Sequence, residues 1–150
     1  MNSNDDGTGK KIIAVFILEI IGRPKEHLVE SLEKIIEDIN KEKGIKIIEK
    51  KINEPIEIKE EKDLYTTFAE VEIESEGMLQ IAGLMFKYMP SNVEIVEPET
   101  ISIKNGLWSE ILTELTRRLH KYDEVARILQ IQNKKMQDRI QELEGKEKDR

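Results

Sequence analysis

The stretch KIIAVFILEI, residues 11–20, decides the fold because both of its faces are apolar. In a β-strand alternate side chains point to opposite sides of the sheet. One face would then hold Ile13, Val15 and Ile17, and the other would hold Ile12, Ala14, Phe16 and Leu18. A strand of this kind lies in the middle of a sheet and is covered on both sides. We therefore predict a central strand over residues 11–20.

A helix is predicted directly after this strand, over residues 25–43. The segment Gly22-Arg23-Pro24 breaks the strand, and proline suits the first turn of a helix because its missing N–H is not needed there. Apolar residues then recur at helical spacing, at Leu28, Leu32, Ile35, Ile36 and Ile39. Gly44 follows, where a left-handed residue often ends a helix.

The sequence after Gly44 predicts the remaining elements of an α+β domain that spans residues 11–105. Residues 1–10, before this domain, are predicted to be a disordered tail. The elements after Gly44 are a strand at 45–52, a polar connection at 53–62, an alternating strand at 64–74, a helix at 78–89, and a last strand made of 93–96 and 101–103. The order strand, helix, strand, strand, helix, strand indicates a ferredoxin-like βαββαβ plait with an antiparallel sheet and both helices on one face. The other face then needs a cover, either the C-terminal helix or a second subunit.

Residues 106–145 predict one long helix, because no proline or glycine lies between Gly106 and Gly145. With Leu112 as position a of a heptad, the a and d positions alternate by 4 and 3 over about five heptads, which is typical of a coiled coil. The predicted dimer interface consists of Trp108, Leu112, Leu115, Leu119, Tyr122, Ala126, Leu129, Asn133, Met136, Ile140 and Leu143. Residues 146–150 are predicted to be a second disordered tail.

Asn133 is the polar residue of this seam, and it predicts how two helices pair. An Asn at position a hydrogen-bonds to its symmetry mate, which favours a parallel, in-register dimer at some cost in stability. In that arrangement Arg118 would face Asp123 of the second helix, and Arg139 would face Glu144. The sequence therefore favours a homodimer.

Two alternatives for the long helix stay open. It could lie wholly or partly on its own sheet, because apolar residues outside the seam broaden the stripe in its first half: Ile111, Val125 and Ile128. It could also pair with a different protein, in which case the chain would be a structural interaction module.

The turn between the first strand and the first helix is a candidate ligand site. Glycine lets a ligand approach the backbone, and the start of a helix favours anions. Here the chain resembles the ACT regulatory domain, a plait that often has an Asp-Arg-Pro-Gly turn at this point and binds amino acids or related small molecules between paired domains. Arg23 and Pro24 match that turn, whereas Gly22 replaces the acidic residue and Lys25 the final glycine. The resemblance implies a small anionic ligand at Gly22, Arg23 and Pro24; an ordinary turn is the alternative.

Composition limits the classes of function. The net charge is -7 and the pI is about 5.1, which opposes binding to DNA because affinity for phosphates comes from clustered Lys and Arg. The chain has no cysteine, which removes disulfides and thiolate chemistry and fits the cytoplasm. No secretory signal is recognised at the start, and the apolar run at 12–21 is too short to cross a membrane as a helix. We expect no membrane span.

Catalytic and metal-binding patterns are not recognised in the sequence. It has no nucleophile elbow, no phosphate loop and no pairing of histidine with carboxylates, so we expect no enzyme and no cofactor. His27 and Glu30 lie one helical turn apart, but two ligands do not close a metal site. His120 is expected to be a solvated helix residue. We expect no metal.

Charged and aromatic side chains of the predicted strands suggest two further interpretations. Glu70, Glu72 and Glu74 share one face, and we expect Lys46 and Lys50 of the neighbouring strand to form ion pairs with them. Phe16 of the first strand, with Tyr65 or Phe68 of the third, could form the stacking platform of an RNA-binding plait. The favoured expectation is a homodimeric regulatory or adaptor protein of the cytoplasm that recognises a small ligand or a protein, with RNA binding as an alternative.

Overall fold

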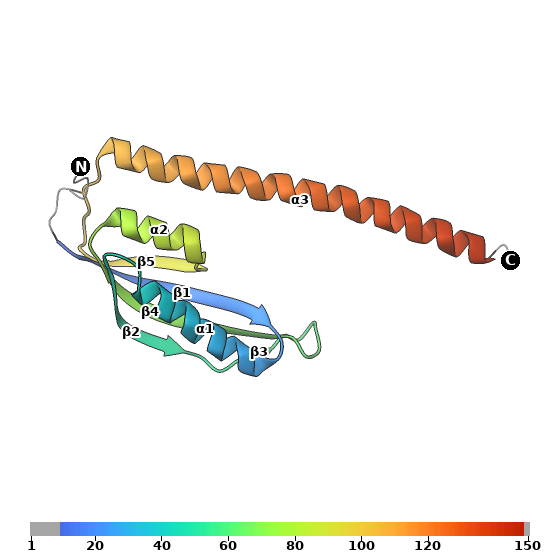
Figure 1. Cartoon of the computed structure of the whole chain (residues 1–150), viewed down its shortest axis with the longest axis horizontal. Helices are drawn as coiled ribbons and strands as arrows, with labels where there is room; N and C mark the ends of the chain where they lie inside the picture. The colour runs from blue at the N-terminus through green and yellow to red at the C-terminus, as the bar shows by residue number, and fades with distance from the viewer. Residues whose placement is uncertain (1–9, 149–150) are drawn as a thin grey trace. The chain divides into compact units, whose positions relative to one another are not determined.

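The computed structural model describes residues 10–148, and the chain divides into two units, residues 1–108 and 109–150. The first unit contains the sheet and two helices, and the second is helical (Figure 1). The elements are β1 (Ile12–Gly22), α1 (Lys25–Asn40), β2 (Ile45–Ile52), β3 (Ile56–Glu57), β4 (Tyr65–Ser75), α2 (Met78–Tyr88), β5 (Asn92–Glu97) and α3 (Asn105–Lys148).

The first unit is an α+β arrangement built on an open antiparallel sheet. The long strands lie in the order β2-β4-β1-β5, and the two-residue β3 pairs with β4. β1 therefore lies between β4 and β5, which confirms the central position predicted from its apolar sequence. The register pairs Phe16 with Val71 and Ala14 with Ile73, so alternate residues of neighbouring strands share a face.

The core lies on one face of this sheet. Its buried side chains come from two strands and two helices: Ile12, Ala14, Phe16 and Leu18 of β1; Ala69, Val71 and Ile73 of β4; Leu32, Ile36 and Ile39 of α1; and Ile81 and Leu84 of α2. The partly buried Val93 of β5 packs against them. Phe16 is 0% exposed at its centre. Because both helices contribute to this one cluster, they cover the same face of the sheet.

The opposite face of β1 differs from the sequence prediction. Ile13, Val15 and Ile17 are half-buried, not buried, because no helix of the first unit packs over them within the described residues. Long side chains on the neighbouring strands, such as those of Glu70 and Glu72, are expected to shield these three residues partly from water. A cover for this face stays a prediction.

The turn from α1 to β2 depends on Gly44. α1 ends at Asn40, three residues before the predicted end, and Gly44 has a φ of 76°, in the left-handed region. A Cβ there would lie 2.9 Å from Glu76 Oε2, while the N–H of Glu76 donates to the Gly44 carbonyl at 2.9 Å. The predicted left-handed glycine is confirmed, but it shapes the entry into β2 instead of capping α1 directly.

The last predicted strand is wrong in its second half. β5 comprises Asn92–Glu97 alone, and residues 101–103 have no strand structure. Ile101 nevertheless packs against the core, so its apolar character reflects burial and not strand pairing. In the connection predicted at 53–62, Ile56 and Glu57 form the short β3. Burial and strand pairing leave the same apolar pattern in a short stretch.

The predicted tails need one correction. α3 continues through Gly145 to Lys148, so residues 146–148 are helical. A single glycine weakens a helix by about 1 kcal/mol without having to end it. Residues 149–150 of that predicted tail lie outside the described residues, as do residues 1–9 of the predicted N-terminal tail.

A polar cluster joins the turn after α1 to the end of α2. Glu42 Oε1 accepts a hydrogen bond from Tyr88 Oη at 2.7 Å and another from Lys87 Nζ. The bond from Lys87, then that from Tyr88, lowers the pKa of Glu42 from its ordinary 4.5, and the bond to Glu42 raises the pKa of Lys87 from 10.5. The cluster therefore stabilises the fold above pH 4.5, and this contribution is lost as the pH falls through the lowered pKa of Glu42.

Lys87→Met is expected to lower the free energy of unfolding more at pH 7 than at about pH 2, because Glu42 is protonated as the pH falls through its lowered pKa. Urea unfolding of the variant and the unmodified chain at a series of pH values measures this. Lys34→Met, on the exposed side of α1, is the control and should show no such pH dependence. A loss of stability for Lys87→Met that is equal at both pH values would contradict the role given to Glu42.

Candidate self-association interface

The predicted seam lies on one continuous helix. α3 has 44 residues, which corresponds to about 66 Å at 1.5 Å per residue. All the seam positions from Trp108 to Leu143 fall within it, so the heptad spacing places their side chains along one stripe. The structure thus provides the helix that the seam requires; pairing of two such helices stays a prediction.

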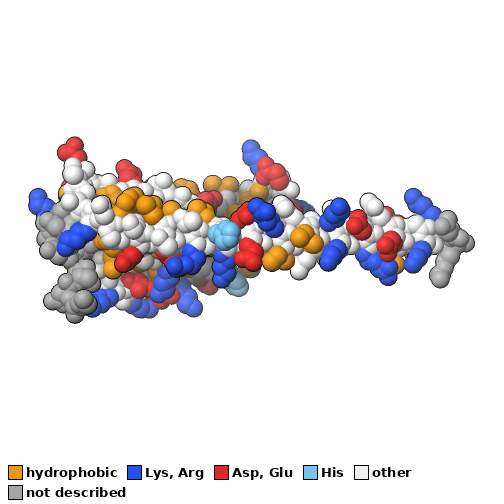
Figure 2. Space-filling view, turned by 90° about the horizontal axis from the view of Figure 1, so that it is seen from above, with side chains coloured by type: hydrophobic (Ala, Val, Ile, Leu, Met, Phe, Trp, Pro, Cys, Tyr) orange, Lys and Arg blue, Asp and Glu red, His pale blue; other side chains and the backbone are white. Residues whose placement is uncertain are grey.

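Apolar side chains of the C-terminal half of α3 are exposed. Leu129 is 58% exposed, Met136 59% and Ile140 54%. Within residues 109–148 the structure describes one helix and no second element that could cover them. Figure 2 shows hydrophobic side chains among blue and red charged ones along the molecule. A lone helix cannot enclose a core, so burying this stripe requires another surface.

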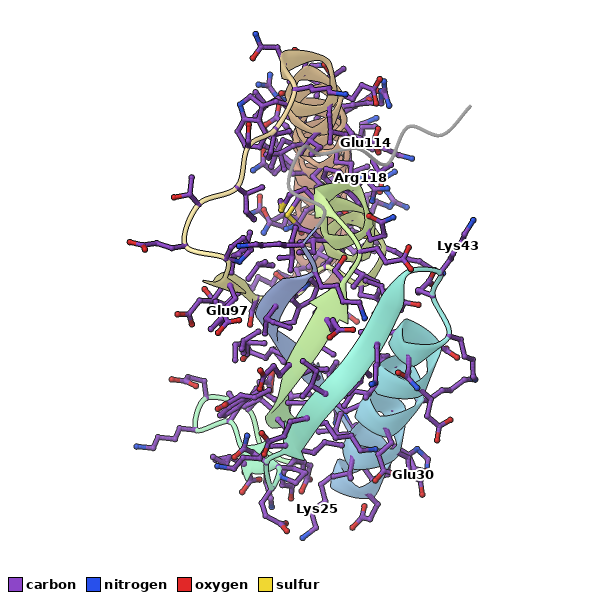
Figure 3. The ribbon with its side chains drawn as sticks, turned by 90° about the vertical axis from the view of Figure 1, so that its left-hand side faces the viewer. Lys25, Glu30, Lys43, Glu97, Glu114 and Arg118 are labelled. Carbon is purple, nitrogen blue, oxygen red and sulfur yellow. The ribbon has the colours of Figure 1, made fainter. Side chains whose placement is uncertain are left out.

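Charged residues beside the seam form ion pairs within α3. Arg118 Nε lies 2.8 Å from Glu114 Oε1, and both side chains are labelled in Figure 3. The hydrogen bond from Arg118 is the largest cause that lowers the pKa of Glu114. Arg139 Nη1 lies 3.0 Å from Glu142 Oε2. The sequence predicted that both arginines would pair with acidic residues of a second helix instead. Ion pairs at a protein surface contribute little to stability, so replacing the pairs within α3 by pairs between two helices would cost little free energy.

Some exposed apolar residues of α3 lie outside the predicted seam. Val125 and Ile128 were recognised from the sequence as broadening the stripe, and both are exposed. Ile131, at 58% exposed, was missed. It occupies heptad position f, which faces away from the partner in a two-stranded coiled coil. The signal that could have revealed it is an isoleucine at a position that is ordinarily polar.

The turn predicted as a ligand site has an internal packing role. Gly22 ends β1 opposite Tyr65, and a Cβ added to it would lie 3.2 Å from Leu28 Cδ2. Arg23 and Pro24 are exposed, and the peptide bond between them is cis. The close approach of Leu28 of α1 therefore explains the glycine, and a ligand at this turn stays a prediction.

The acidic row of β4 lies on the half-buried face of the sheet, but its neighbours differ from the prediction. Lys46 lies beside Glu74 as expected, but the ion pair that the structure gives Glu74 is with Lys11. The register then shifts between Ile47 and Glu49, so that Lys51 lies beside Glu70. Lys50, predicted to pair with the acidic row, lies beside Val71 instead. A bulge adds one residue to a strand, so each side chain after the bulge points to the opposite face of the sheet from the one that simple alternation predicts.

The remaining candidate residues do not converge on a site. The backbone carbonyl of His27 accepts a hydrogen bond from Ser31 Oγ at 2.6 Å. No group of three potential metal-ligating side chains is found among residues 10–148. Phe16 is buried beneath the helices while Phe68 is exposed on the other face, so the aromatic platform predicted for RNA stacking is not formed.

A family model matches most of the chain. The model of the MJ0538 family matches residues 13–148, from the second residue of β1 to the last residue of α3. The match therefore covers both the α+β unit and the long helix, and the family's description names no activity, substrate or partner. Neither a curated protein nor a solved structure matches the chain. No helix in the described part of the chain is long and apolar enough to span a membrane.

Proposed function

This chain belongs to the MJ0538 family, and we propose that it is a homodimeric regulatory or adaptor protein whose two copies pair through α3. The observation that carries this proposal is the exposed seam on one uninterrupted helix. Pairing in parallel buries Leu129, Met136 and Ile140 against their counterparts. Each fully buried side chain of this kind contributes about 1.5–3 kcal/mol.

Asn133 supports the parallel arrangement. In a parallel, in-register pair the two Asn133 side chains meet and hydrogen-bond to each other, whereas an antiparallel pair leaves each amide against apolar residues. The charged residues agree with this orientation, because Arg118 and Arg139 would each lie near an acidic residue of the other helix.

The α+β unit supplies the recognition surface in this proposal, and we assign it to the ferredoxin-like plait. When the two-residue β3 is left out, the spatial order of the strands is second, third, first and fourth along the chain, with both helices in one core cluster. This order supports the plait. An ACT-like role for Gly22, Arg23 and Pro24 in binding a small anion has weaker support, since packing against Leu28 explains the glycine. A cytoplasmic location is supported by the absence of cysteine from the sequence.

Leu143→Cys is expected to form a disulfide-linked dimer on mild oxidation, because a d position meets its own counterpart only in a parallel, in-register pair. The sequence has no cysteine, so any disulfide must join the two introduced residues. Non-reducing gel electrophoresis measures the cross-linked fraction.

The matched control is Asp138→Cys, on the same helix at position f, which should cross-link poorly. Equal cross-linking of the two variants would indicate random collision. A monomer for both, with light scattering confirming one chain per particle, would overturn the homodimer and favour pairing of α3 with a different protein.

A further inference from the structure

The face of the sheet opposite α1 and α2 combines an apolar stripe with carboxylates on both sides. Ile13, Val15 and Ile17 form the stripe along β1 and are half-buried. In register with them on β4 lie Glu74, Glu72 and Glu70, and on β5 lie Glu97, Glu94 and Asn92. Figure 3 shows Glu97 at the end of β5, across the sheet from α1. The exposed Phe68 extends the apolar surface beside Glu19.

Cations of the same face lie at one end and along one edge. Lys11 bonds Glu74, and this hydrogen bond is the largest cause that lowers the pKa of Glu74. Lys46 and Lys51 lie on the edge strand β2. In the row of residues that runs across the strands through Val15, Glu72 of β4 lies on one side of Val15 and Glu94 of β5 on the other. Glu49 of β2 lies beyond Glu72 in the same row. Like charges opposite each other on a sheet are destabilising, so this row favours a cationic partner.

We propose that this face, defined by Ile13, Val15 and Ile17 with Glu72 and Glu94, binds a basic amphipathic helix of a partner protein. The carboxylate rows of β4 and β5 are about 10 Å apart, since neighbouring strands are about 4.8 Å apart, and this equals the diameter of a helix of about 10 Å. Apolar side chains of such a helix would lie on Val15, and its Lys or Arg residues would reach the carboxylates on each side.

Charge decides between this occupant and two others. A second copy of this face would bring Glu72 and Glu94 against carboxylates, which is repulsive. An RNA would bring phosphates to the same carboxylates. A basic helix is the occupant that satisfies both the apolar stripe and the charge. The inference deepens the adaptor role proposed above but does not depend on pairing through α3.

The test uses the full chain and a synthetic 18-residue helical peptide, about 27 Å long, with leucines on one side and lysines on both flanks. Fluorescence anisotropy is expected to show binding that weakens with salt, and no binding of a peptide in which glutamate replaces every lysine. Glu72→Lys combined with Glu94→Lys is expected to weaken binding roughly thirtyfold.

The matched control is Glu33→Lys combined with Glu37→Lys, which makes the same change of net charge on exposed positions of α1 and should weaken binding less than threefold. Val15→Thr keeps the shape of the stripe and should weaken binding even at high salt. Circular dichroism checks that each variant is folded.

If both double variants weakened binding of the basic peptide equally, the net charge of the protein alone would explain the effect, and the proposal would be overturned. It would also be overturned if the acidic peptide bound as well, or if Glu72→Lys with Glu94→Lys altered self-association of the chain alone. A monomeric chain that still binds the basic peptide would contradict the pairing through α3 and leave this inference standing.

Discussion

If two copies pair through α3 as proposed, Leu129→Asp is expected to separate them into monomers. Leu129 is a d-position residue and is 58% exposed in the single chain, so pairing is what would bury it. Each dimer would lose two buried leucines, about 4 kcal/mol in all, or roughly a thousandfold in the dissociation constant, before the cost of placing two carboxylates in a dry seam. Sedimentation velocity over a range of protein concentrations measures this change.

Ile131→Asp is the matched control for that variant. Ile131 lies on the same helix, is also 58% exposed, and occupies a position outside the seam. The same change of charge there should leave the proposed dimer intact. If Ile131→Asp separated the copies and Leu129→Asp did not, the heptad register assigned to α3 would be wrong.

Phe16→Ala is expected to lower the free energy of unfolding of the α+β unit by about 3–5 kcal/mol, because it leaves a cavity where a fully buried aromatic side chain packed. Such a loss is a large part of the 5–15 kcal/mol that is typical of a native domain. Guanidinium unfolding, followed by circular dichroism on the Leu129→Asp background, measures it without a contribution from self-association.

Phe68→Ala supplies the comparison for this second variant. Phe68 lies one strand away on the opposite face and is 38% exposed, so the same truncation should cost about 1 kcal/mol or less. Similar losses for both variants would mean that the two faces of the sheet are equally buried, and would contradict the open face on which the peptide-binding inference rests.

Local patterns predicted most of the α+β unit well. The apolar run of β1 indicated a central strand, although one of its faces is only half-buried. The helical spacing from Leu28 to Ile39 indicated α1, because burial of one stripe of a helix leaves a periodic record in the sequence. The last strand was overextended for the same reason. Ile101 is apolar because it packs on the core, and burial alone does not distinguish a strand from a loop.

The faces of β2 could not be predicted from alternation. The bulge between Ile47 and Glu49 adds one residue, so Lys51 and not Lys50 reaches the side of Glu70. A bulge depends on how two strands distant in sequence fit together, and it leaves no periodic signal in one of them. The bulge also places Glu49 beside Glu72, which adds a carboxylate to the row that runs through Val15.

For the long helix, the sequence alone determined the heptad seam and its polar residue Asn133, because side chains along a helix recur with a period that nearly matches the heptad. Which strands became neighbours, and therefore which carboxylates flank Ile13, Val15 and Ile17, was decided only by the tertiary structure. The physical reason is range: periodicity arises from contacts within one element, whereas register and open faces arise from pairing between elements far apart in the chain.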